Sequence, residues 1–337
     1  MSGNQQKGIN KSGIKNIRKK RIVFMGTPEF AVASLETLLI NKFYVAGVVT
    51  APDRQSGRGL KLQQSAVKKF AIKSSLPVLQ PTNLKDREFI NELKKIKPDL
   101  LVVVAFRMLP DEVWQLPPLG TINLHASLLP QYRGAAPINW VLINGEETTG
   151  VTTFFIDDKI DTGKIIYQDK VEIAPGENAG TLHDKLMVKG AELVNKTVKS
   201  ILEGVSPQTD QSTLTKTQPE LKKAPKLRNE NCEIPWEKSA VEVYNFIRGL
   251  SPHPGAWTKI KNQKGETSIL KIFETEVIPE KYENKPGTIL TDDLSYLKIA
   301  TNNGFVKLLS VQLPGKKQMD IIPFLRGFDT DGLRFEV

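Results

Sequence analysis

The sequence predicts an α/β protein in which a Rossmann-like, mostly parallel sheet flanked by helices is followed by a small OB-like β-barrel. First, apolar β-prone runs alternate with amphipathic helical segments as far as residue 204. Second, the run LLVVVAF at residues 100–106 is too apolar for a strand with one exposed face, so it predicts a central strand covered on both sides. Third, the β-prone runs beyond residue 229 are short and separated by Gly and Pro.

The first half of the chain alternates between the two kinds of element. The opening run RIVFMG predicts a strand, with Thr27 as the N-cap and Pro28 as the first residue of the helix that follows. Apolar periodicity predicts the remaining elements. These are helices at residues 30–39, 63–75 and 181–204 and strands at residues 43–50, 100–106, 121–125, 151–156 and 164–168.

Composition divides the chain into four parts. Residues 1–20 form a basic tail that we expect to be disordered, because it has too little apolar surface to fold by itself. Residues 21–205 form the Rossmann-like domain. Residues 206–229 are rich in Ser, Thr, Pro, Gln and Lys and predict a linker, and residues 230–337 form the OB-like domain.

The charge and the composition exclude several classes of protein. Most of the net charge of +10 comes from the tail, so the folded part is nearly neutral and the overall charge is weak evidence for RNA binding. No apolar run approaches the roughly 20 residues that span a bilayer, so no membrane partner is expected. The single cysteine, Cys232, excludes an intramolecular disulfide and a Cys-based zinc cluster, which suits a reducing cytoplasm.

Three polar side chains form the candidate site. Asn123 and His125 lie two residues apart at the end of a predicted strand, so both face the same side of the sheet. Ligands of open α/β sheets bind beyond the carboxyl ends of the strands, where this pair is placed. Asp161 follows in the turn IDTG between two further strands. The opening turn GTPEF lacks the G-x-G-x-x-G fingerprint, so a bound nicotinamide dinucleotide is not expected.

Four segments of the chain resemble one protein family. They are MGTPEFA, PDRQSGRGLKL, NLHASLLPQYRGAAPINW and GVTTFFIDDKIDTG, and the third is the most specific. Through them the chain resembles the formyltransferases that use 10-formyltetrahydrofolate, and among these the methionyl-tRNA formyltransferases. The resemblance covers nearly everything from residue 21 to the linker, and the C-terminal part is similar in length and in the pattern GTI followed by GKK.

The resemblance implies a reaction and its participants. We expect a formyl group to pass from 10-formyltetrahydrofolate to the α-amino group of methionine on initiator methionyl-tRNA, giving formylmethionyl-tRNA for translation initiation. Asn123, His125 and Asp161 match the catalytic trio of the family. We also expect a cytoplasmic monomer that uses no metal ion. The stretch that borders the folate is matched by Ser127, Leu128, Leu129 and Pro130.

A basic loop and the C-terminal domain are the expected contacts for tRNA. The resemblance implies that the loop at residues 51–62 reaches the acceptor stem, with Arg58 its most important residue and flanking glycines that let it order on binding. Arg133 is expected to be structural or adjacent to the folate. The predicted tRNA-binding residues are Arg54, Arg58, Lys61, Lys316 and Lys317.

The three residue types of the candidate site suit formyl transfer to an amine. The Asn123 amide and a protonated His125 can donate hydrogen bonds to the oxyanion that develops on the formyl oxygen, and each such donor is typically worth about 3 kcal/mol. Asp161 can favour the imidazolium and accept the proton that the amine loses, which is typically worth about 10²- to 10⁴-fold in rate.

One segment departs from the family pattern. The family has Tyr-Gly before a Leu-Pro pair, whereas this chain reads FRMLP and is one residue shorter, so Phe106, Arg107 and Met108 are expected to adjust the folate pocket. Other functions stay open. The basic loop argues against a formyltransferase that acts on a nucleotide-linked amino sugar, and the intact trio argues against an inactive RNA-binding protein. A folate deformylase is a minor third alternative.

Overall fold

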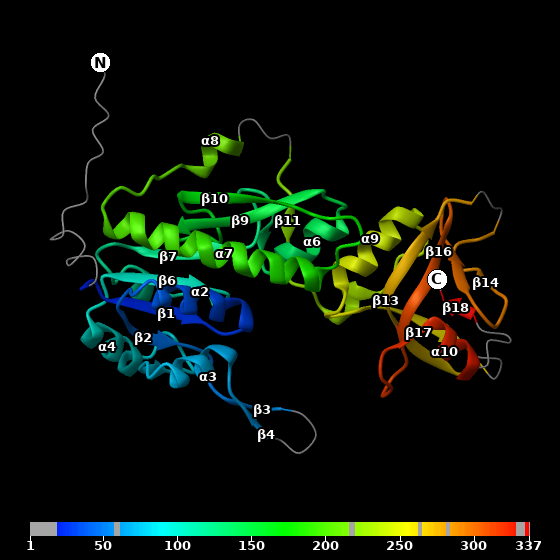
Figure 1. Ribbon diagram of the computed structural model, residues 1–337, viewed down its shortest axis with the longest axis horizontal. Helices are drawn as coiled ribbons and strands as arrows, with labels where there is room; N and C mark the ends of the chain where they lie inside the picture. The colour runs from blue at the N-terminus through cyan, green and yellow to red at the C-terminus, as the bar shows by residue number, and fades with distance from the viewer. Residues whose placement is uncertain are drawn as a thin grey trace. The chain divides into compact units, whose positions relative to one another are not determined.

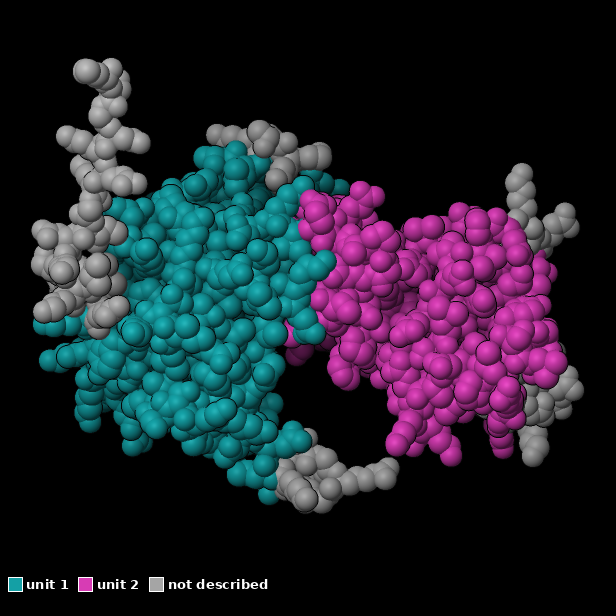
Figure 2. All heavy atoms as spheres, viewed as in Figure 1, with its two compact units in different colours: residues 1–133, 150–171, 184–221 teal, residues 134–149, 172–183, 222–337 magenta. Residues whose placement is uncertain are grey.

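The chain folds into two compact units whose segments alternate along the sequence. The structure is a computed structural model and describes residues 19–56, 61–215, 220–261, 265–280, 284–327 and 334–336. Unit 1 comprises residues 1–133, 150–171 and 184–221, and unit 2 comprises residues 134–149, 172–183 and 222–337 (teal and magenta in Figure 2). Within the described ranges, none of the helices combines the length and the hydropathy that a bilayer-crossing segment needs.

Unit 1 is built on a seven-stranded sheet in the order β10-β9-β7-β6-β1-β2-β5 (Figure 1). Five of these strands run parallel, and β9 pairs antiparallel with β7. The predicted mostly parallel α/β sheet is therefore confirmed. The strands are β1 (Ile22–Gly26), β2 (Val45–Val49), β5 (Val78–Leu79), β6 (Leu100–Val104), β7 (Thr121–His125), β9 (Thr148–Phe155) and β10 (Ile165–Glu172).

Helices cover both faces of this sheet, which explains why every residue of β6 is buried. Side chains of α4, such as Phe89, pack with Val103 of β6 on one face. On the other face α7 passes so close that a Cβ on its Gly190 would lie 2.6 Å from Leu124. Asn123 is the register partner of Val103 and therefore shares the α4 face. The helices of unit 1 are α2 (Glu29–Ile40), α3 (Ala66–Lys73), α4 (Arg87–Ile96), α5 (Asp111–Trp114), most of α7 (Ala179–Leu202), and α8 (Gln211–Thr215).

The first helix begins one residue later than predicted. Pro28 occupies the N-cap of α2 with φ −81° and ψ 177°, and no side chain caps the helix, so the assignment of Thr27 as N-cap is wrong. Proline suits both positions, since its fixed φ fits an extended N-cap as well as a first helical turn. The turn itself needs Gly26, because a Cβ there would lie 2.6 Å from the Cβ of Ala31.

The basic loop contains a short antiparallel hairpin of β3 (Arg54–Ser56) and β4 (Lys61–Gln63). Its base is anchored by Asp53, whose carboxylate accepts hydrogen bonds from Lys68 Nζ at 2.6 Å and from Gln80 Nε2 at 2.8 Å. These two donors, Lys68 before Gln80, hold the pKa of Asp53 below its ordinary value. The tip of the hairpin, which includes Arg58, lies outside the described residues.

Unit 2 contains an antiparallel sheet in the order β14-β15-β16-β13-β12-β18, with β17 added beside β16 (Figure 1). The long strands β13 and β16 shift register on either side of Glu274, and such irregularities bend a sheet. The small barrel predicted from the sequence is thus a curled antiparallel half-barrel. Its strands are β12 (Ala256–Lys261), β13 (Thr267–Ile278), β14 (Ile289–Thr291), β15 (Leu297–Ala300), β16 (Phe305–Gln312), β17 (Met319–Asp320) and β18 (Arg334–Glu336).

Two helices close the core of unit 2. Side chains of α9 (Ala240–Leu250) and α10 (Ile321–Gly327) pack with the strands in one apolar cluster, in which Trp236 is 1% exposed. The earlier segment of the unit supplies α6 (Pro137–Ile143), which packs on α9 through a hydrogen bond of 2.8 Å from Asn139 Nδ2 to the Gly249 carbonyl. Cys232, in the 3₁₀ helix η1 (Asn229–Cys232), is also buried, and burial raises the pKa of its thiol.

The segment predicted as a linker is divided between the two units. Residues up to 221 belong to unit 1 and carry α8, whereas residues from 222 onward belong to unit 2 and carry β11 (Lys223–Ala224). Strand β11 pairs with the two-residue strand β8 (Arg133–Gly134). A Cβ on Gly134 would lie 2.3 Å from the Ala224 carbonyl oxygen, so this close backbone approach requires glycine.

Candidate active site

Each ring nitrogen of His125 faces a polar group of the protein. It is the last residue of β7, and its Nε2 lies 2.8 Å from the Tyr132 carbonyl oxygen. A carbonyl oxygen only accepts, so Nε2 carries a proton and donates it. The other nitrogen, Nδ1, faces the Asp161 carboxylate with 3.8 Å between Nδ1 and Oδ2. The neutral ring thus presents its lone pair toward Asp161, and protonation at Nδ1 gives an imidazolium beside a carboxylate.

Asp161 reaches His125 from the loop between β9 and β10. The side chains of the two residues are 13% and 7% exposed, so the pair is largely shielded from water. Asp161 has a left-handed backbone with φ +55°, which is unusual for a residue with a side chain. Gly163 makes the loop possible, because a Cβ there would lie 1.7 Å from the Phe155 carbonyl oxygen. Packing therefore requires glycine at the third position of the Asp-Thr-Gly turn.

Asn123 lies two residues before His125 on the same face of β7. Its side chain is half-buried, and it forms no hydrogen bond with any residue in the described part of the chain. An amide carries two donor hydrogens and one acceptor oxygen, so its hydrogen-bonding capacity is available to a ligand. The structure thus brings the imidazole and the carboxylate into contact, with a free amide on the same strand.

The predicted folate-bordering stretch begins two residues after His125 and forms a buried turn. Ser127 Oγ donates to the Gln131 carbonyl at 2.6 Å, and the Leu129 amide donates to Thr152 Oγ1 at 3.1 Å. Ser127, Leu129 and Pro130 are buried. Leu128 is the one member of the stretch with a partly exposed side chain, so it offers surface to a ligand while the other three shape the turn.

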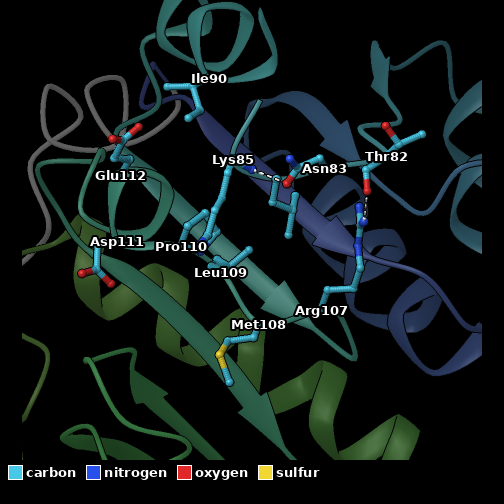
Figure 3. Close-up of a pocket in the computed structure, with 11 residues that line it drawn as sticks. Thr82, Asn83, Lys85, Ile90, Arg107, Met108, Leu109, Pro110, Asp111 and Glu112 are labelled. Atoms are coloured by element: carbon cyan, nitrogen blue, oxygen red, sulfur yellow. Dashed lines mark hydrogen bonds between the residues drawn. The ribbon is translucent and has the colours of Figure 1, made fainter. Parts of the chain in front are cut away.

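A hollow of about 730 Å³ lies beside the end of β6, the strand next to β7 (Figure 3). Figure 3 shows Arg107 reaching toward Thr82, and its guanidinium donates to the Thr82 carbonyl at 2.9 Å and to the Pro81 carbonyl at 2.7 Å. Burial, and then the nearby Arg54, lower the pKa of Arg107. Met108 also lines the hollow and is 73% exposed. Residues 107–110 of the departing segment FRMLP therefore form one wall of this hollow.

The predicted tRNA-binding residues lie in both units. Arg54 is exposed on β3, and Lys61 belongs to β4, although its side chain is outside the described part of the structure. Lys316 and Lys317 are exposed in the turn between β16 and β17 of unit 2. Arg133, expected to be structural or adjacent to the folate, donates to Gln211 Oε1 from Nε at 3.1 Å and from Nη2 at 2.5 Å.

Several residues that complete this site are not apparent from the sequence. Tyr132 contributes its main-chain carbonyl, which accepts from His125. Thr152 and Gln168 fix the turn after His125, with 2.9 Å from Gln168 Nε2 to the Leu129 carbonyl. Gln211 lies in the polar segment predicted as a linker. Among the residues that the structure describes, no group of three His, Cys, Asp or Glu side chains is arranged to hold a metal ion.

The fold and this combination of side chains define a class of enzyme. Residues 20–198 match the family described as formyl transferase, and residues 226–329 match the formyl transferase C-terminal domain. Among solved structures, the N-formyltransferase from Helicobacter canadensis in complex with folinic acid and dTDP-3-aminofucose has a TM-score of 0.61 and 22% identity, over 86% of this chain and 98% of that chain. At this identity the likeness shows a shared fold.

Curated relatives narrow the class. The methionyl-tRNA formyltransferase of Bacteroides fragilis is 52% identical over 91% of this chain and 95% of the relative. That of Flavobacterium johnsoniae is 52% identical over 92% of this chain and 97% of the relative. The chain therefore belongs to the methionyl-tRNA formyltransferase family.

Proposed function

We propose that the chain transfers the formyl group of 10-formyltetrahydrofolate to the α-amino group of methionine on initiator methionyl-tRNA, which yields formylmethionyl-tRNA for translation initiation. The observation that carries the chemistry is the His125 imidazole, held between the Tyr132 carbonyl and the Asp161 carboxylate. We infer the identity of the acceptor from the relatives, which are methionyl-tRNA formyltransferases at 52% identity over nearly the whole chain. Because aminoacyl-tRNA is the acceptor, we place the reaction in the cytoplasm.

Asn123 and His125 stabilise the charge that develops during transfer. The amine nitrogen forms a bond to the formyl carbon, and an electron pair moves onto the formyl oxygen. The Asn123 amide and the Nδ1 proton of an imidazolium donate hydrogen bonds to this oxygen, and removal of one such donor typically costs about 3 kcal/mol of transition-state stabilisation. Since Nε2 is already committed to Tyr132, the donating atom of His125 is Nδ1.

Asp161 holds and moves protons at this centre. The ammonium that results from attack loses a proton, which the carboxylate accepts directly or through a water molecule. The electron pair on the formyl oxygen then re-forms the carbonyl as the bond between the formyl carbon and the folate nitrogen breaks. The electron pair of the broken bond stays on that nitrogen, which takes up a proton. An imidazolium at His125 would lie beside the Asp161 carboxylate, with 3.8 Å between Nδ1 and Oδ2.

The folate donor fits the edge of the sheet where β6 and β7 end. Leu128 offers apolar surface on the β7 side, and the hollow beside Arg107 and Met108 lies on the β6 side. An exposed methionine is a favourable contact for an aromatic ring system, because its sulfur is polarisable and its side chain adapts in shape. We propose that the donor lies across these two loops, bordered by residues 127–130.

We propose that unit 1 is the catalytic domain and that tRNA contacts both units. The three catalytic candidates all belong to unit 1, and we propose that the enzyme acts as a monomer. The exposed side chain of Arg54 in the β3–β4 hairpin, and those of Lys316 and Lys317 in the turn after β16, offer positive charge to tRNA phosphates. The predicted contacts are Arg54, Arg58 and Lys61 in the hairpin and Lys316 and Lys317 in unit 2.

The proposed function is tested by offering two acceptors separately to the purified protein. Formyl transfer from 10-formyltetrahydrofolate is measured with initiator methionyl-tRNA and with a nucleotide-linked amino sugar, using wild type and Asp161→Asn. We expect rapid transfer to methionyl-tRNA and a loss of at least about 10²-fold in kcat for the variant, because the substitution removes the proton acceptor.

The other outcomes are equally informative. Transfer only to the amino sugar would keep the chemistry and replace the acceptor. Transfer to neither acceptor would contradict the proposal and favour an RNA-binding protein without catalytic activity. Full activity of Asp161→Asn would remove Asp161 from the mechanism.

A further inference from the structure

Gln211 is a buried amide whose hydrogen bonds all lie next to the candidate active site. It begins α8, in the segment predicted as a linker, and is 2% exposed. Its Nε2 donates to the carbonyl oxygens of Asp161 at 3.0 Å and of Gly163 at 2.8 Å. Its Oε1 accepts from two nitrogens of Arg133, at 3.1 Å and 2.5 Å. Both donor hydrogens and both lone pairs of the amide are therefore in use.

These bonds connect the two backbone segments that flank the His125 ring. Arg133 directly follows Tyr132, whose carbonyl accepts from Nε2, and Asp161 supplies the carboxylate that faces Nδ1. Tyr132 and Asp161 both have left-handed backbones, with φ of +59° and +55°. Conformations of this kind in non-glycine residues are costly and persist only where their surroundings hold them. Gln211 is placed to hold both segments at once.

We propose that Gln211 is a positioning residue for formyl transfer, which fixes the Asp161 carboxylate relative to the His125 imidazole by tying the Asp161 loop to Arg133. This inference rests on the proposed function. Gln211 acts through the carbonyls of Asp161 and Gly163 and through Arg133, and its own side chain touches neither reactant. Its removal changes the placement of Asp161 and therefore the chemical step, while the surfaces that bind folate and tRNA stay in place.

The test compares Gln211→Met with Asp161→Asn and with the double variant. Methionine has a similar length and no amide, so the two carbonyls and Arg133 lose their partner together. We expect Gln211→Met to lower kcat about 10- to 100-fold, the range expected for a displacement near 1 Å, and to leave both KM values within about twofold. In the Asp161→Asn background the same substitution is expected to lower kcat no further, since its effect passes through Asp161.

Thr197→Val serves as the matched control. Thr197 is also a fully buried, hydrogen-bonded polar residue of unit 1, but it contacts Thr153, which faces the side of the sheet opposite His125. It is expected to lower Tm while kcat stays within about twofold of wild type, because it removes a buried hydrogen bond away from the site. If the loss of kcat in Gln211→Met were caused only by lower stability, Thr197→Val would show a similar loss of kcat at a similar decrease in Tm.

Three results would overturn the inference. They are a kcat for Gln211→Met within twofold of wild type, losses that multiply in the double variant, and an equal loss of kcat in the control. Full activity of Asp161→Asn would instead contradict the catalytic role of Asp161 on which the inference rests. The single variant Asp161→Asn shows this independently of Gln211→Met. If Gln211→Met does not fold, Gln211→Glu replaces it. Glutamate keeps the partner of Arg133 but turns a carboxylate toward the two carbonyls, so the same loss of kcat is expected.

Discussion

Two of the seven described non-glycine residues with a left-handed backbone supply the partners of one imidazole. Tyr132 and Asp161 are non-glycine residues in the left-handed region, and they supply the partners of Nε2 and Nδ1 of His125. Each such conformation costs on the order of 1–3 kcal/mol, which the surrounding hydrogen bonds must offset. The site is therefore rigid because neighbouring groups hold it, and small changes at its supports are expected to reach the chemistry.

The substitution Gly163→Ala, which adds a single carbon atom, tests whether the site is rigid. The added Cβ would lie 1.7 Å from the Phe155 carbonyl oxygen, so the Asp161 loop must move. We expect kcat to fall by about 10²-fold, since a displacement near 1 Å at a catalytic group has an effect of that size. Steady-state kinetics with methionyl-tRNA measure it.

Gly327→Ala is the control for this substitution. Among the residues that the structure describes, none lies within 4 Å of a Cβ placed on Gly327, at the end of α10, so kcat and Tm are expected to stay near wild type. Unchanged kcat in Gly163→Ala would mean that the loop tolerates displacement and that the packing argument is wrong.

At this scale the sequence indicates candidate reactive groups, but it does not indicate the residues that support them. Asn123, His125 and Asp161 carry the functional groups that the chemistry requires, and they occur in short motifs at strand ends. Gln211 supports Asp161 from 50 residues away, within a polar segment that has no apolar period. Tyr132 contributes a main-chain carbonyl, and no side-chain pattern can indicate that role.

At the scale of secondary-structure elements, the base of the β3–β4 hairpin is anchored by one carboxylate. Asp53 accepts from Lys68 and Gln80, and its side chain is 15% exposed. These contacts lower its pKa below the ordinary 3.8. The depressed pKa means that Asp53 stabilises the folded state fully above pH 3.8 and that this stabilisation is lost as the pH falls through the folded-state pKa.

Asp53→Asn is therefore expected to be destabilising at neutral pH and much less so in acid. The measurement is Tm for wild type and variant between pH 7 and pH 3. The difference between the two is expected to be constant down to about pH 4 and to shrink below it, because the wild-type carboxylate then takes up a proton in the unfolded state before it does so in the folded state. A difference that is the same at every pH would show that the ionised form of Asp53 contributes nothing.

Apolar sequence patterns predict the order of the buried elements, but they do not predict elements that are held by polar contacts. The alternation of apolar runs predicts the sheet of unit 1, and the confirmed central strand β6 follows from its continuous burial. The hairpin at residues 54–63 lacks apolar alternation, so the sequence predicts only a loop there. It is held instead by the polar anchor at Asp53, which the local pattern does not reveal.

For the whole molecule, we expect tRNA affinity to depend on charge in unit 2 as well as in unit 1. Lys316 and Lys317 are exposed in the turn after β16. Replacing both with Gln is expected to weaken tRNA binding and to reduce the slope of log K against log salt by roughly 0.7 to 0.9 for each phosphate that the protein no longer neutralises. Filter binding or fluorescence titration over a range of salt concentrations measures this slope.

A second pair of lysines controls for the change in net charge. Lys94 and Lys95 are adjacent and exposed on α4, and their replacement with Gln alters the charge equally. We expect the salt slope to stay at its wild-type value in this variant. Equal slopes in the two double variants would contradict a specific tRNA interaction at residues 316 and 317.

The alternation of the two units along the chain has a consequence for synthesis on the ribosome. Residues 134–149 and 172–183 emerge well before residues 222–337, which complete their unit. Unit 1 in turn lacks Gln211 until residue 211 has left the exit tunnel, so the hydrogen bond from Gln211 to the Asp161 carbonyl cannot form before then. The nascent chain therefore carries α6 without its partner α9 for much of its elongation, which exposes apolar surface during that interval. A protein that we place at the first step of translation would thus itself be a client for nascent-chain chaperones, and premature termination near residue 205 would release a chain with both units unfinished.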